Sequence, residues 1–187
     1  MGSDDGYVQI PDEGIYETLR NDVQSVVWRH LMKGNVARPR AIMIIWLACH
    51  EKLATKDRLH KFGMVENTKC CFCGKMESIN HLLFDCDEMN RLWMRILDWI
   101  QITHVSKVWD EKILCLVDCS KGKEWRASFS NLRLPETIYG IWNYWNDKSF
   151  GQNVTNPNLG DKNIDTIVYR GWYNGKHRKH IARLMIF

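Results

Sequence analysis

The 187-residue sequence has only four prolines and no long apolar run. Its most apolar stretch, residues 41–49, is less than half as long as the roughly 20 residues of a membrane-spanning helix, so we expect no membrane segment. The first fourteen residues hold four acids and no Lys or Arg, unlike the basic start of a secretory signal. We therefore expect a reducing compartment, the nucleus or the cytoplasm.

The sequence also lacks the alternation of apolar and polar residues that indicates β-strands. Apolar residues recur instead at spacings of three and four, which predicts helices, most clearly over 87–100. The stripe of that helix is Met89, Leu92, Trp93, Ile96, Leu97 and Ile100. We expect a further helix whose first turn contains Pro135, a loop over 151–163, a buried Trp46, and a short helix after Thr55 with Leu59 and Phe62 facing the core.

The most specific pattern is the stretch CCFCGKMESINHLLFDC at residues 70–86. Cys70 and Cys73 form a Cys-x-x-Cys pair followed by Gly74, and His81 and Cys86 form a second pair with four residues between them. Three thiolates and one imidazole make a closed tetrahedral set of the kind that structural Zn²⁺ takes. The fold class predicted is mainly α, an irregular helical domain with an embedded Cys-Cys-His-Cys zinc knuckle.

Several alternatives remain open for these residues. Cys71 can replace Cys70 as a ligand, although Cys71-x-Cys73 is the poorer chelate, and the cysteines can also be free thiols or a redox pair. Glu77 either shapes the turn before His81, orients a ligand, or is simply solvated. The other cysteines are expected to be buried thiols: Cys49, Cys115 and Cys119.

The net charge of +4 is unevenly distributed. No acid follows Asp165, whereas five basic residues do, and a basic end on a near-neutral body favours contact with phosphate. The competing interpretation is a solvated helix face. The candidate nucleic-acid-binding residues are Arg170, Lys176, Arg178, Lys179 and Arg183.

Several tracts together carry a resemblance to a known family. PRAIMIIWLACHEKLATKDRLHKFGM, then the knuckle, then Leu92-Trp93, resembles the zinc-binding domain that follows the reverse transcriptase in plant LINE-type retrotransposons. A looser similarity continues in IYGIWNYWNDKSFG, where Trp145 stands in place of the family's usual Arg. The resemblance covers residues 14–100 well and 136–187 loosely, and no polymerase motif accompanies it.

The resemblance implies a non-catalytic, zinc-binding accessory module that binds RNA or DNA, and we expect no enzyme. The alternative is a protein-interaction module held together by structural zinc, with an exposed Trp109, Trp125 or Trp172 as anchor. We divide the chain into a disordered acidic lead (1–12), a helical zinc-binding domain (13–102) and a helical C-terminal extension with a basic end (103–187).

Overall fold

The computed structural model describes residues 28–32, 34–99, 125–151 and 159–173. The predicted acidic lead, the start of the zinc-binding domain, residues 103–123 and the basic end beyond Tyr173 lie outside these ranges. So do the predicted thiols Cys115 and Cys119.

Helices make up the described parts of the chain. They are α2 (Arg29–Met32), α3 (Pro39–Cys49), α4 (Lys56–Lys61), the π-helix η1 (His81–Asp85), α5 (Asp87–Trp99), α7 (Trp125–Phe150) and α8 (Leu159–Tyr173). These ranges contain no strand, only an isolated antiparallel bridge between Lys69 and Met76. The mainly α class is therefore confirmed. None of the described helices is both long and apolar enough to cross a membrane.

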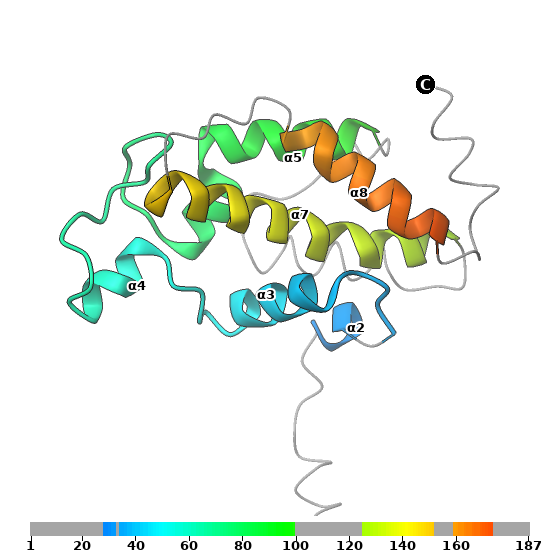
Figure 1. Ribbon diagram of the computed structural model, residues 1–187, viewed down its shortest axis with the longest axis horizontal. Helices are drawn as coiled ribbons and strands as arrows, with labels where there is room; N and C mark the ends of the chain where they lie inside the picture. Colours follow the sequence, from blue (N-terminus) through cyan, green and yellow to red (C-terminus); the bar gives the residue numbers. More distant parts are fainter. Residues whose placement is uncertain (1–27, 33, 100–124, 152–158, 174–187) are drawn as a thin grey trace, which may run out of the picture.

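Helix α7 is the central element of the arrangement. It packs against α3 on one side and against α8 on the other, and α5 contacts both α8 and η1 (Figure 1). One buried cluster takes side chains from both predicted domains, including Ile45 and Leu83 from the first and Ile138 and Trp145 from the second. The core thus spans the predicted boundary at residue 102.

Helix α5 is the element that the apolar spacing predicts best. Its buried residues are Met89, Leu92, Trp93, Ile96 and Leu97, as predicted, while Ile100 lies outside the described residues. The α3 segment was predicted less well, because Trp46 is only half-buried and Met43 is 53% exposed. One side of α3 packs on α7, and the other faces outward.

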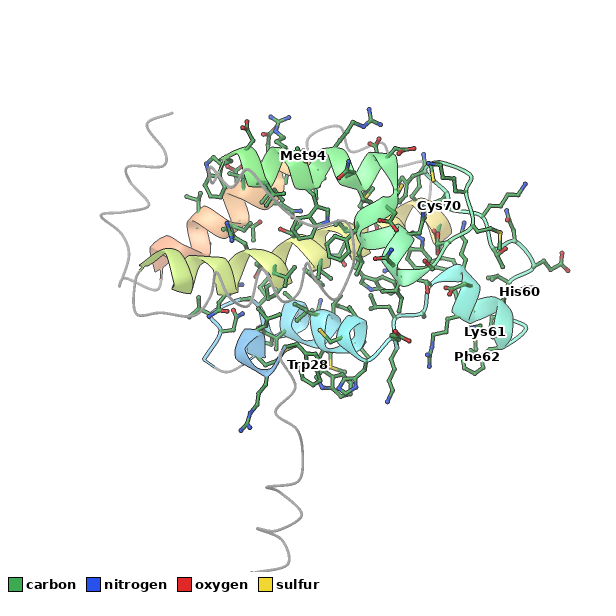
Figure 2. All side chains as sticks on the ribbon, turned by 180° about the vertical axis from the view of Figure 1, so that it is seen from behind. Trp28, His60, Lys61, Phe62, Cys70 and Met94 are labelled. Atoms are coloured by element: carbon green, nitrogen blue, oxygen red, sulfur yellow. The ribbon has the colours of Figure 1, made fainter. Side chains whose placement is uncertain are left out.

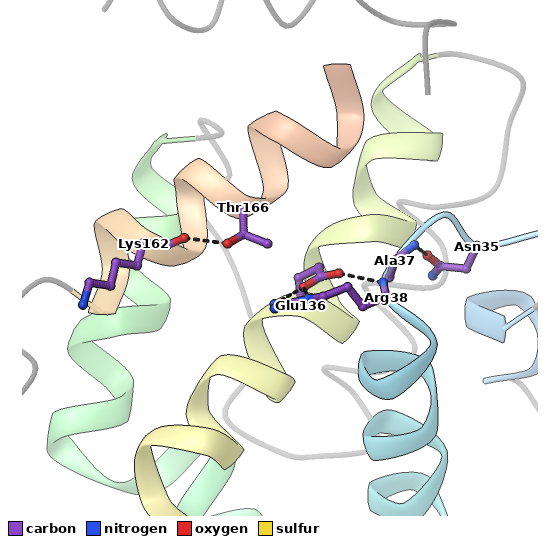
Figure 3. A network of polar contacts seen from close by, with 6 residues as sticks. All are labelled: Asn35, Ala37, Arg38, Glu136, Lys162 and Thr166. Carbon is purple, nitrogen blue, oxygen red and sulfur yellow. Dashed lines mark hydrogen bonds and ion pairs between the residues drawn. The ribbon is translucent and has the colours of Figure 1, made fainter. Parts of the chain in front are cut away.

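Pro135 was predicted to lie in the first turn of a helix, and this was wrong: it lies in the interior of α7. A proline there has no N–H to donate, which frees the carbonyl four residues earlier, at Asn131. The Asn35 side chain replaces that donor, with Nδ2 2.6 Å from the Asn131 carbonyl oxygen and 2.7 Å from that of Leu31. Its Oδ1 accepts the Ala37 N–H at 2.8 Å (Figure 3). One asparagine therefore joins α2, the segment just before α3, and α7.

Beside this contact, Arg38 and Glu136 form an ion pair between the start of α3 and α7 (Figure 3). The Glu136 side chain is fully buried, and it also accepts the Arg38 backbone N–H at 2.8 Å. The predicted loop over 151–163 is shorter than expected, because α8 already begins at Leu159 and continues through Gly171.

Candidate metal centre

The first half of the candidate site is a tight turn. The Gly74 N–H donates to the Cys70 carbonyl at 2.9 Å, and the Cys70 N–H donates to the Lys75 carbonyl at 2.8 Å. Gly74 has φ +74°, a backbone conformation that is energetically unfavourable for residues with a Cβ. The backbone N–H groups of Phe72 and Cys73 also hydrogen-bond the Cys70 sulfur, so the turn favours a thiolate.

The second half of the site comes from η1 and the start of α5. The His81 N–H donates to Ser78 Oγ at 3.1 Å, and the Cys86 N–H donates to the His81 carbonyl at 2.7 Å. Cys86 occupies the position just before α5. Backbone N–H groups of Glu88 and Met89 hydrogen-bond the Cys86 sulfur, which lies where the helix N-terminus favours negative charge.

The fold brings the four predicted donors together. One ligand atom from each of Cys70, Cys73, His81 and Cys86 lies within 4.8 Å of all the others. Cys70 Sγ is 3.9 Å from Cys86 Sγ, and Cys73 Sγ is 3.2 Å from His81 Nε2. Donors around a tetrahedral zinc are roughly 3.5–3.8 Å apart, given the usual bond lengths.

The chemistry of this donor set fits zinc. It contains three sulfurs and one imidazole nitrogen without a carboxylate, and Cys70, His81 and Cys86 are buried. Four protein donors complete a tetrahedron, as in structural zinc sites, whereas catalytic sites keep a position for water. When bound, the metal would cross-link the turn at 70–74 to η1 and α5.

Cys71 lies outside the four-donor group, although it is next to Cys70. Its sulfur accepts a hydrogen bond from Ser149 Oγ at the end of α7, at 3.5 Å. Hydrogen bonds from Cys71 and Cys86 lower the pKa of the Cys70 thiol, which makes Cys70 the readiest thiolate of the site. This geometry favours Cys70 over Cys71 as the ligand. Cys49, the last residue of α3, is half-buried and is not part of the four-donor group.

Glu77 is buried rather than solvated, with 2% of its surface exposed. Its Oε1 accepts the Lys56 backbone N–H at the start of α4 (2.7 Å), and its Oε2 accepts the indole N–H of Trp145 in α7 (2.9 Å). Its own N–H donates to the Thr68 carbonyl at 3.0 Å. Burial raises the pKa of this carboxyl. Glu77 thus joins the knuckle to α4 and α7.

Trp145 was missed as a functional residue by sequence reasoning. The one signal in the sequence was the loose resemblance over residues 136–187, in which Trp145 stands where an Arg was expected. An Arg and an indole share one property that a buried carboxylate needs, an N–H donor on a long side chain. Trp145 is 1% exposed and stacks on Trp142, with ring centroids 4.7 Å apart.

The predicted nucleic-acid-binding residues are only partly described. Arg170 is half-buried in the last turn of α8, at the opposite end of the molecule from α4 (Figure 1). The other four, Lys176, Arg178, Lys179 and Arg183, lie outside the described residues. The same holds for Trp109 and for the side chains of Trp125 and Trp172, the predicted protein-binding anchors.

Comparison with known proteins agrees with the metal geometry. Residues 13–93 match the family model described as zinc-binding in reverse transcriptase. No curated protein and no solved structure is matched by the chain. The matched segment contains all four donors, so this part of the chain is similar to that family and fits a zinc-binding module.

Proposed function

We propose that the chain is a non-catalytic accessory module of a plant LINE-type retrotransposon, acting in the nucleus or cytoplasm, that binds RNA or DNA and is held together by Zn²⁺. The observation that carries this proposal is the closed group of four donors inside the segment that matches the reverse-transcriptase family. A closed site supplies folding energy and leaves no coordination position for a reacting water.

The support for nucleic-acid binding is the charge around the knuckle. Residues 51–80 contain six Lys or Arg and four Asp or Glu, and one of the four acids, Glu77, is buried away from the surface. The exposed cations of this region are Lys52, Lys61, Lys69 and Lys75, of which Lys75 pairs with Asp87 at 3.1 Å. Arg38 is not part of this surface because Glu136 pairs with it.

The test is a salt titration of the zinc-loaded protein with a single-stranded RNA and a single-stranded DNA. The logarithm of the binding constant should fall linearly with the logarithm of salt, with a slope of about 0.7 per phosphate contact. Replacing Lys52 and Lys69 together by Ala should reduce the slope by roughly 1.4. Replacing Lys148 and Lys162 on α7 and α8 is the matched control. No binding at low salt would refute the proposal.

A protein-interaction module is the second candidate. It is favoured by a surface aromatic cluster, in which the rings of Trp28 and Trp46 lie 4.9 and 4.5 Å from the ring of exposed His50. A partner held through these rings should survive nuclease treatment and be lost when Trp46 is changed to Ala. Loss of every partner with nuclease would leave only the first proposal.

A further inference from the structure

A groove beside the candidate zinc site takes no part in metal binding. It has a volume of about 440 Å³, within the range of sites that bind small molecules or single residues. The end of α3, helix α4 and residues 78–80 form its walls. The side chains that line it include Glu51, Asp57, Arg58, Lys61, Phe62 and Asn80.

One edge of the groove presents an aromatic platform. The sequence pattern predicted Phe62 in the core, but its side chain is 63% exposed. It projects with Lys61 from α4 at the edge of the molecule (Figure 2). The Arg58 guanidinium lies 5.4 Å from the centre of the Phe62 ring. An exposed ring beside a guanidinium is the arrangement on which unpaired bases stack.

The inside of the groove is rich in hydrogen-bond acceptors. Asn80 Oδ1 is buried and has no hydrogen-bond partner among the described residues. The carboxylates of Glu51 and Asp57 line the same space, although Asp57 already accepts from Thr55 at 2.5 Å. These acceptors call for a ligand with N–H donors, and they repel a phosphate.

The charges separate the parts of such a ligand. The negative charges of Glu51 and Asp57 balance the positive charges of Arg58 and Lys61, so the interior has no net charge. Two further cations are neighbours of lining residues in the sequence: Lys52 follows Glu51, and Lys56 precedes Asp57. A neutral, acceptor-rich interior suits a base edge, and a basic rim suits the phosphates of the same strand.

We propose that this groove binds an unpaired nucleobase with an exocyclic amino group, from a single-stranded nucleic acid, with the base stacked on Phe62 and the strand's phosphates on Lys52 and Lys56. This inference rests on the proposed nucleic-acid binding and adds where the strand is held and what is recognised. The groove shares a wall with the metal site, because Ser78, which also lines it, accepts the His81 N–H.

The experiment compares three 12-nucleotide DNA strands at pH 7.5 and low salt, by fluorescence anisotropy with the zinc-loaded chain. They are (dC)12, (dT)12 and a strand of twelve abasic sites with the same phosphates. We expect (dC)12 to bind tightest, the abasic strand weakest, and (dT)12 about fivefold or more below (dC)12, because thymine lacks the amino donor.

The matched variants are Phe62→Ala and Phe150→Ala. Phe150 is 61% exposed and lies at the end of α7, outside the groove lining, so it controls for the loss of an exposed ring. F62A should weaken (dC)12 binding roughly 5- to 150-fold and leave binding of the abasic strand unchanged, whereas F150A should change neither. Phe62→Trp keeps the platform and should retain binding.

The outcomes separate the two proposals. If neither these strands nor (rC)12 binds, the proposed function fails. If the abasic strand binds as tightly as (dC)12, or F62A binds like F150A, nucleic-acid binding stands and the base site is refuted. Equal binding of (dT)12 and (dC)12 would refute the role of the acceptors in the groove.

Discussion

Replacing Trp145 by Phe tests whether α7 supports the zinc knuckle through Glu77. The substitution removes the indole N–H that lies 2.9 Å from Glu77 Oε2 and keeps an aromatic ring in the core. Both side chains are almost fully buried, at 1% and 2% exposure. The carboxylate would then keep the Lys56 N–H on its other oxygen, but water could not replace the lost donor without entering the core.

The expected cost follows from that geometry. A hydrogen bond to a charged group contributes about 1.5–3 kcal/mol, and the smaller ring loses some further packing, so we expect a loss of roughly 2–4 kcal/mol in the free energy of unfolding. Domains of this size are stable by about 5–15 kcal/mol, so the change is large. Trp145→Arg, which keeps an N–H donor on a long side chain, should lose less of the hydrogen-bond contribution.

Urea unfolding of the zinc-loaded chain, followed by circular dichroism, measures this cost. Trp142→Phe is the matched control, because Trp142 is a half-buried neighbour that stacks on Trp145 without contacting Glu77 by any described hydrogen bond. In a double-mutant cycle, W145F should lower the free energy of unfolding less in the Glu77→Gln background than in the parent chain. The reasoning is refuted if W145F costs no more than W142F and its effect simply adds to that of E77Q.

Three further changes have definite expected results. Cys73→Ala or His81→Ala should abolish zinc binding and unfold much of residues 64–100, because structural zinc contributes about 10–16 kcal/mol to the free energy of folding. Elemental analysis measures the metal content and circular dichroism measures the loss of helix. Cys49→Ala is the control and should keep the metal. Asn35→Ala should lower the free energy of unfolding, measured with urea, by about 2–3 kcal/mol. The loss should be smaller in a Pro135→Ala background, because residue 135 then donates its own backbone N–H to the Asn131 carbonyl. Equal losses in the two backgrounds would contradict the role of the Asn35–Asn131 hydrogen bond. Burial raises the pKa of Cys49 to about 12, so the Cys49 thiol should resist iodoacetamide at pH 8. The contribution of this buried thiol to the stability of the folded chain should be lost only as the pH rises toward that value. Rapid labelling of the folded chain would contradict this prediction.

The parts of the fold that sequence reasoning predicted are those in which local spacing decides the structure. Five residues of one stripe were enough to predict the buried face of α5, since a single helix places them on one side. The Cys-x-x-Cys turn and the His-x4-Cys pair are likewise local, and each depends on hydrogen bonds within a few residues. Their meeting in one group of donors was implied by the donor chemistry.

The parts that were predicted wrongly depend on distant partners. Pro135 follows the first-turn rule unless another residue satisfies the carbonyl that it frees, and here that residue is Asn35, 96 positions from the Asn131 carbonyl. Phe62 has the spacing of a core residue, but α4 has only six residues and no buried side chain, so its apolar positions need not face inward. Neither outcome is contained in the local pattern.

Distant partners also explain why the matched segment is not a self-contained structural unit. The family match ends at residue 93, yet α7, which begins at Trp125, contacts the knuckle at three points. Trp145 donates to Glu77, Ser149 donates to Cys71, and the ring of Tyr144 lies 4.9 Å from that of Phe72 in the turn. These three residues lie in the last two turns of α7, so this end of the helix supports the turn that carries two of the four donors. The metal would fix the knuckle from within, and α7 fixes it from outside, so changes on either side should act on the same local stability.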